Sequence, residues 1–147
     1  MPILNYTTKI DPAQTVGEIQ AILAKAGVAA VSIEYHQTQP VAVIFVLDVA
    51  GQFVNFRLPS RWQGVQKRLQ ADNVSKRLQS EDHAKRVAWR IVKDWVEAQL
   101  AIVEAGVAEM PEVFLPYAVN PQSGKTLYQE FEGNYLPAPE GKGSTAA

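Results

Sequence analysis

The chain has 147 residues, of which 47% are hydrophobic and 20% are charged, and its net charge is −1. This length fits one domain, which buries about two-thirds of its unfolded surface. The absence of cysteine excludes disulfides, thiolate metal sites and thiol nucleophiles. The first residues lack the pattern of a signal peptide, and the longest near-apolar run, residues 41–47, is too short to cross a bilayer. We therefore expect a soluble, cytoplasmic protein without a membrane partner.

The small net charge hides a strong segregation of charge along the chain. Residues 1–56 carry a net charge of −2, residues 57–93 carry +7 and residues 94–147 carry −6. Such an asymmetry bears on the choice of partners rather than on the fold. The ten cations of the basic middle segment are Arg57, Arg61, Lys67, Arg68, Lys76, Arg77, Lys85, Arg86, Arg90 and Lys93.

The first two elements are expected to be a strand and a helix. Residues 5–10 are rich in residues that favour strands. Asp11 and Pro12 then resemble an N-cap followed by proline at the first helical position. Apolar residues recur at helical spacing over residues 13–26, and Gly27 marks the end of this helix.

Three further strands are predicted at residues 30–36, 41–49 and 53–58. The first and third alternate between apolar and polar residues, whereas the middle one is apolar on both faces. The middle strand should therefore be the most covered, and Val54, Phe56 and Leu58 should face the core. The side chains expected on a shared polar face are Ser32, Glu34, His36, Asn55 and Arg57.

The second half is predicted to be mainly helical. A short helix is expected over residues 62–70 and a long one over residues 80–106, which has acidic residues in its first turn. An apolar segment at 112–119 and a short helix at 126–131 follow, and residues 137–147 have the composition of a flexible tail. The apolar residues of the long helix cover more than half of its circumference, so it is either central to the domain or shared with a second copy.

These elements predict an α+β fold. We expect an antiparallel sheet of three to four strands packed on a long helix, in the approximate order β-α-β-β-β-α-α with a C-terminal extension. Residues 1–136 should form a single domain, followed by the tail at 137–147. If the long helix is shared, the protein is a homodimer through residues 80–106.

No catalytic, metal or nucleotide motif is complete in this sequence. The Gly124-Lys125-Thr126 run lacks the earlier glycine of a phosphate-binding loop, because Val119 stands in that position. His36 and His83 have no second histidine nearby at the spacing of metal ligands. We therefore expect no cofactor, no metal and no catalysis. The enzymatic alternative would use Glu34, His36 and Arg57 on the open sheet face.

The basic middle segment favours nucleic-acid binding. Lys and Arg neutralise phosphates, and aromatic rings stack on unpaired bases. The alternative is that these cations pair with acids, in particular Arg86 and Arg90 with Asp94 and the acidic C-terminal third. The candidate residues for binding DNA or RNA are Phe53, Asn55, Arg57, Arg61, Trp62, Lys67, Arg68, Lys76 and Arg77.

Three short stretches carry a resemblance to other proteins. They are VAWRIVKDWVEAQL at 87–100, FLPY at 114–117, and FRLP at 56–59, which leads into Trp62. Through these stretches the chain resembles small uncharacterised proteins of phage, prophage and mobile-element gene clusters. The resemblance covers most of the chain up to Leu136 and implies a bacterial cytoplasm as the setting. It implies either a DNA-handling accessory protein or, as the alternative, a module that binds or inhibits a host protein.

Overall fold

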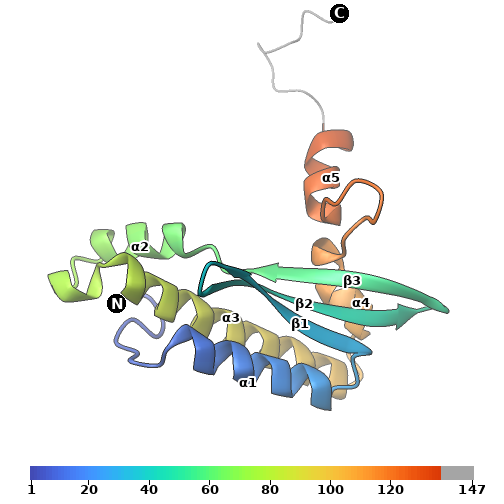
Figure 1. The fold of residues 1–147 in the computed structure, drawn as a ribbon, viewed down its shortest axis with the longest axis horizontal. Coiled ribbons are helices and arrows are strands. Elements are labelled where there is room, and N and C mark those ends of the chain that lie inside the picture. Colours follow the sequence, from blue (N-terminus) through green and yellow to red (C-terminus); the bar gives the residue numbers. More distant parts are fainter. Residues whose placement is uncertain (137–147) are drawn as a thin grey trace, which may run out of the picture.

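The computed structural model describes residues 1–136 and shows an α+β fold, which confirms the predicted class. Its sheet is antiparallel and has three strands in sequence order: β1 (Ala30–His36), β2 (Gln39–Val49) and β3 (Gln52–Pro59). Figure 1 shows α1 and α3 side by side along the sheet, α2 at one end and α5 standing away from the body. The predicted tail at 137–147 lies outside the described residues.

Five α-helices and two short 3-10 helices complete the part of the chain described. The helices expected in the second half form close to their predicted bounds, and the one predicted at 126–131 continues to Asn134. The helical elements are α1 (Pro12–Lys25), α2 (Trp62–Ala71), η1 (Lys76–Leu78), α3 (Glu81–Glu104), α4 (Met110–Phe114), η2 (Leu115–Tyr117) and α5 (Leu127–Asn134).

The sheet has one core face and one open face, as the alternation in the sequence predicts. Phe56 and Leu58 are buried, whereas Arg57 between them is half-buried and Asn55, just before Phe56, is exposed. The β2–β3 turn has a positive φ at both Ala50 and Gly51, a combination typical of tight hairpins. The core face also buries Val43, Phe45 and Leu47 of β2 against α1 and α3. The open face is only partly polar, because β2 contributes apolar side chains between the polar residues of β1 and β3.

Helix α3 is central to the domain. Ser80 caps its first turn by accepting a hydrogen bond from the His83 N–H. It packs against α1, α2, α4 and η1, and its Trp89 is buried in the main core. On another side, Trp95 meets the rings of Phe114 and Tyr117 edge-on, with centroids 5.4 Å away in each case. Much of the apolar surface of α3 is therefore used inside the domain.

The expected strand at residues 5–10 does not form. The chain turns at residues 4–7, and Asn5 has a φ of 65°, which a strand cannot accommodate. Ile3 and Tyr6 instead join a second apolar cluster between α2 and α3. Hydrogen bonds fix the backbone there, from the Ile3 N–H to Asp72 and between the His83 ring and the Tyr6 carbonyl. Tertiary packing therefore overrides the local strand preference.

An ionic contact joins α1 to α3. The Arg90 guanidinium donates to the Glu18 carboxylate at 2.8 Å and to the Thr15 hydroxyl at 3.3 Å. Lys93 adds a longer contact of 3.7 Å to the same carboxylate. Hydrogen bonds from Gln14 and Arg90 lower the pKa of Glu18 below its ordinary value, because they favour the charged form. The two helices that cover the sheet are thus linked through one carboxylate.

This contact predicts a pH-dependent contribution to stability. Glu18→Gln should lower the free energy of unfolding at pH 7 by about 0.5–1 kcal/mol. Since the folded-state pKa is depressed, the contribution is complete above the ordinary value of 4.5 and is lost as the pH falls through the folded-state value. Urea denaturation at pH 7 and at stepwise lower pH measures it. Glu104→Gln, which removes a carboxylate without an ion pair within residues 1–136, is the control. A constant difference between wild type and Glu18→Gln at all pH values would contradict this origin.

Candidate nucleic-acid interface

Six of the ten cations in the basic middle segment form ion pairs within residues 1–136. The pairs join Arg57 to Glu34, Arg68 to Asp72, Lys85 to Glu81, Arg86 to Asp11, Arg90 to Glu18, and Lys93 to both Glu18 and Glu97. Most of the positive charge in this segment therefore has a partner in the fold.

The partners differ from those expected from the sequence. Among the pairing acids only Glu97 belongs to residues 94–136, the described part of the acidic C-terminal third. Arg86 and Arg90 face α1 and pair with Asp11 and Glu18, whereas the Asp94 carboxylate accepts a hydrogen bond from Asn5. The expected pairing of these two arginines with Asp94 and the C-terminal acids is therefore wrong, because α1 is the element that packs on this side of α3.

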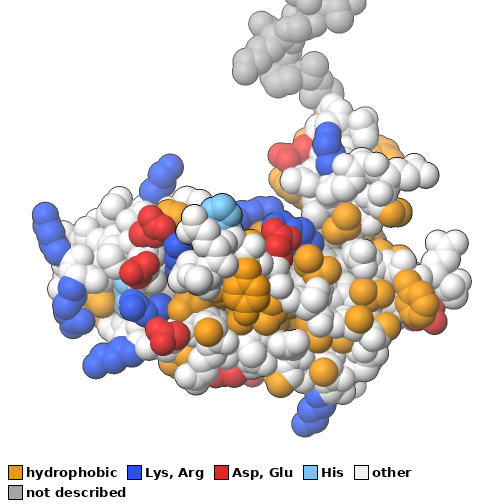
Figure 2. Space-filling view, in the orientation of Figure 1, with side chains coloured by type: hydrophobic (Ala, Val, Ile, Leu, Met, Phe, Trp, Pro, Cys, Tyr) orange, Lys and Arg blue, Asp and Glu red, His pale blue; other side chains and the backbone are white. Residues whose placement is uncertain are grey.

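Four cations form no ion pair within residues 1–136: Arg61, Lys67, Lys76 and Arg77. All four are exposed. Arg61 precedes α2, Lys67 lies on α2, and the other two belong to η1, which follows α2. Figure 2 shows Lys and Arg side chains standing out from the end of the molecule that carries α2 and the start of α3. We call these four residues the α2–η1 cations.

The two candidate stacking residues lie far apart. Phe53 is 74% exposed at the start of β3, next to the β2–β3 turn. In Figure 1 this turn is at the opposite end of the sheet from α2. Trp62 begins α2, is half-buried in the second apolar cluster, and has the Lys85 ammonium 5.4 Å from its ring centroid. Only Trp62 is therefore close in the chain and in space to the α2–η1 cations.

Asn55 and Arg57 lie on the open sheet face. The Arg57 guanidinium donates two hydrogen bonds to the Glu34 carboxylate, at 2.9 and 3.1 Å, across the middle strand. These bonds lower the pKa of Glu34, so the pair is a charged, bidentate unit. The Asn55 carbonyl accepts a hydrogen bond from the Val119 N–H at 2.7 Å. The predicted site residues thus divide into an open-face group and a group around α2.

A cleft of about 570 Å³ connects these two groups. It lies between the β1–β2 hairpin, the end of β3, and the starts of α2 and α3. Arg57 and Trp62 both line it, as does His36. The Ser60 Oγ, also on this cleft, is buried without a hydrogen-bond partner in the described part of the chain. The sequence reasoning missed Ser60, since a hydroxyl after a strand carries no local signal of burial.

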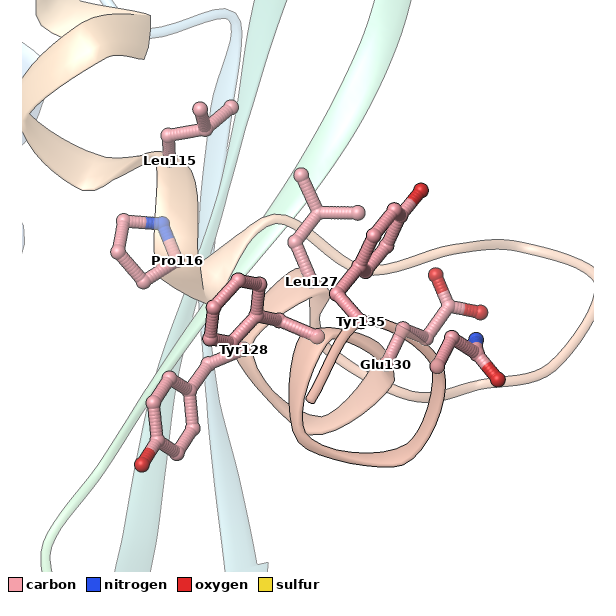
Figure 3. A pocket seen from close by; sticks show the side chains of 8 residues that line it. Leu115, Pro116, Leu127, Tyr128, Glu130 and Tyr135 are labelled. Atoms are coloured by element: carbon pink, nitrogen blue, oxygen red, sulfur yellow. The ribbon is translucent and has the colours of Figure 1, made fainter. Parts of the chain in front are cut away.

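The C-terminal arm, residues 118–136, holds a second surface that the sequence reasoning missed. Its helix α5 contacts the rest of the domain chiefly through η2. An apolar groove of about 400 Å³ runs between the two elements, and Figure 3 shows Leu115 and Pro116 on its η2 side and Leu127, Tyr128 and Tyr135 on the other. The exposed large apolar side chains of η2 and the arm are Leu115, Leu127, Tyr128, Phe131, Tyr135 and Leu136.

Two kinds of structural feature are absent from residues 1–136. No helix in this range is long and apolar enough to cross a membrane. Within the same residues no group of three or more His, Asp or Glu side chains is placed to hold a metal ion. Comparison of the chain with protein-family models, with curated proteins and with solved structures gives no match.

The buried hydroxyl of Ser60 gives a test of the cleft. An unpaired buried hydroxyl is costly, so Ser60→Ala should raise the free energy of unfolding by about 1 kcal/mol. The Ser60 N–H keeps its bond to the Val41 carbonyl in this variant. Ser80→Ala is the matched control, because it removes a working helix cap and should lower stability by about 1 kcal/mol. Urea denaturation measures both changes. An equal loss in the two variants would show that the Ser60 hydroxyl has a partner in solution.

Proposed function

We propose that this protein binds nucleic acid without catalysis, as an accessory protein of a phage or mobile element in a bacterial cytoplasm. The observation that carries the proposal is the set of α2–η1 cations, which are exposed, free of ion pairs within residues 1–136, and carried by the single stretch of chain that forms α2 and η1. Phosphate contacts of this kind provide affinity rather than sequence specificity.

The surroundings of these cations favour single-stranded DNA or RNA. Single strands are bound by positive charge along the backbone together with an aromatic platform for the bases. Trp62 lies at the start of the same helix and lines the cleft, where its ring can meet an unpaired base. The glutamines Gln37, Gln39 and Gln63 add hydrogen-bond donors and acceptors to the cleft wall. Arg57 lines the cleft and can contribute to the same binding site. Phe53, beside the β2–β3 turn, is too distant from the cleft to belong to one short site.

The proposal predicts a salt-dependent affinity that specific lysines control. In Lys67→Ala/Lys76→Ala, the slope of log K against log salt for a single-stranded oligonucleotide should become less steep by about 0.7 per lysine. Fluorescence anisotropy with a labelled oligonucleotide over a range of salt concentrations measures this slope. Lys25→Ala/Lys125→Ala removes the same charge from two exposed positions elsewhere and should leave the slope close to that of wild type. Absence of binding by the wild type at low salt would overturn the proposal.

The groove beside α5 favours a second candidate function, that of a protein-binding module. A group of exposed apolar side chains on a projecting element marks an interaction surface. Glu130 lines the groove and Glu132 lies one turn from Tyr128, so the rim is acidic. We therefore assign it a partner segment with apolar side chains flanked by a basic residue, as electrostatic complementarity requires.

Phe131→Asp should abolish this interaction. After nuclease treatment of a bacterial lysate, wild type should retain one stoichiometric protein, and cross-links should join α5 to an apolar segment with a basic flank. Val107→Asp, which places the same charge at an apolar residue that is 76% exposed outside the arm, should retain it equally. Recovery by the Phe131 variant, or cross-links that join two copies of this chain, would exclude this partner.

A further inference from the structure

A polar pocket of about 330 Å³ lies between the N-terminal segment, η1 and the start of α3. Its walls carry three cations, one from each of these segments: Lys9, Arg77 and Arg86. Asp11 is its one acidic lining residue. The buried side chain of His83, which is 4% exposed, completes its inner surface. The basic segment and the N-terminal segment, far apart in sequence, therefore supply one concave and positively charged site.

The cations of this pocket are available to a ligand. Lys9 and Arg77 form no ion pair within residues 1–136. Arg86 approaches Asp11 only to 3.7 Å, which is longer than a charge-assisted hydrogen bond, and the Asp11 side chain is 78% exposed. Solvent therefore weakens that pair, and a ligand with greater negative charge can compete for the guanidinium.

We propose that this pocket binds a terminal phosphoryl group. Two guanidinium groups and an ammonium from separate elements suit a compact anion with two charges and several acceptor oxygens. The hydroxyls of Thr7 and Thr8 lie on the same wall and can donate to further oxygens. A concave site of this size admits the end of a strand or a mononucleotide more readily than a phosphodiester inside a continuous backbone.

The assignment of a strand end as the source of the phosphate rests on the proposed function. Arg77 belongs both to the pocket and to the α2–η1 cations, so a strand whose terminal phosphate enters the pocket can continue along η1 and α2. The binding of the phosphoryl group itself does not depend on that function. A phosphorylated small molecule could use the same three cations.

The first arm of the test uses inorganic pyrophosphate and thermal unfolding. Pyrophosphate should raise the Tm of wild type, and Arg77→Gln/Arg86→Gln should lose this rise. Lys67→Gln/Arg68→Gln removes the same charge from α2, which does not line the pocket, so this variant should keep the rise in Tm. Lys9→Gln, at an exposed residue outside any helix, should weaken the response without affecting folding. If pyrophosphate does not raise the Tm of wild type, or if both double variants lose the rise equally, the proposal that this pocket binds a phosphoryl group is overturned.

The second arm separates the pocket from the proposed function. Wild type should bind a 5′- or 3′-phosphorylated single strand about tenfold more tightly than the same strand with hydroxyl ends, and Arg77→Gln/Arg86→Gln should lose this preference. Binding without an end preference and without a pyrophosphate response would overturn the pocket and leave nucleic-acid binding intact. A response to pyrophosphate and to a nucleoside monophosphate, with no strand binding, would keep the pocket and reject nucleic-acid binding.

Discussion

The packing of α3 against several neighbours at once is the constraint on which the rest of the structure depends. One side of this helix buries Trp89 and Val96 in the core under the sheet, and others meet α1, α2 and α4. Helix α2 is placed chiefly by its contact with α3, whereas α1 lies between α3 and strands β1 and β2 and contacts all three. The positions of the cations follow from this arrangement, because Arg86 and Arg90 must face α1, whereas α2 and η1 carry their cations on the outer side.

The features that could be predicted from the sequence are those encoded by local patterns. The Ala50-Gly51 turn, the Ser80 cap and the alternation in β3 are each specified within a few residues, and the structure has all of them. Residues 5–10 show the opposite case. Their preference for a strand is weak compared with the burial of Ile3 and Tyr6 beside α2, and no local pattern reveals that contact.

The candidate sites also combine features that are visible in the sequence with features that depend on tertiary contacts. The concentration of cations in residues 57–93 is visible in the sequence, but the availability of each cation depends on which acids the fold brings near. Glu18 and Glu34 are distant in sequence from the arginines they meet, so those pairs require the tertiary structure. The same holds for the pocket that joins Lys9 to Arg77, and for the groove of the C-terminal arm, where the sequence indicates a helix but not its projection from the body.

The contact between the arm and β3 has a consequence for the behaviour of the sheet edges. Phe56 forms an antiparallel bridge with Ala118, and the neighbouring Asn55 carbonyl bonds to Val119, so this short segment covers part of an edge that would otherwise expose unpaired backbone groups. On the other side of the sheet, the pairing of β1 with β2 shifts register between Glu34 and Tyr35, where Val41 of β2 has no partner on β1. The covered β3 edge is thereby a poor template for adding a strand from another chain. A protein shortened before Ala118 would keep its helical core and yet expose the β3 edge to aggregation by sheet extension.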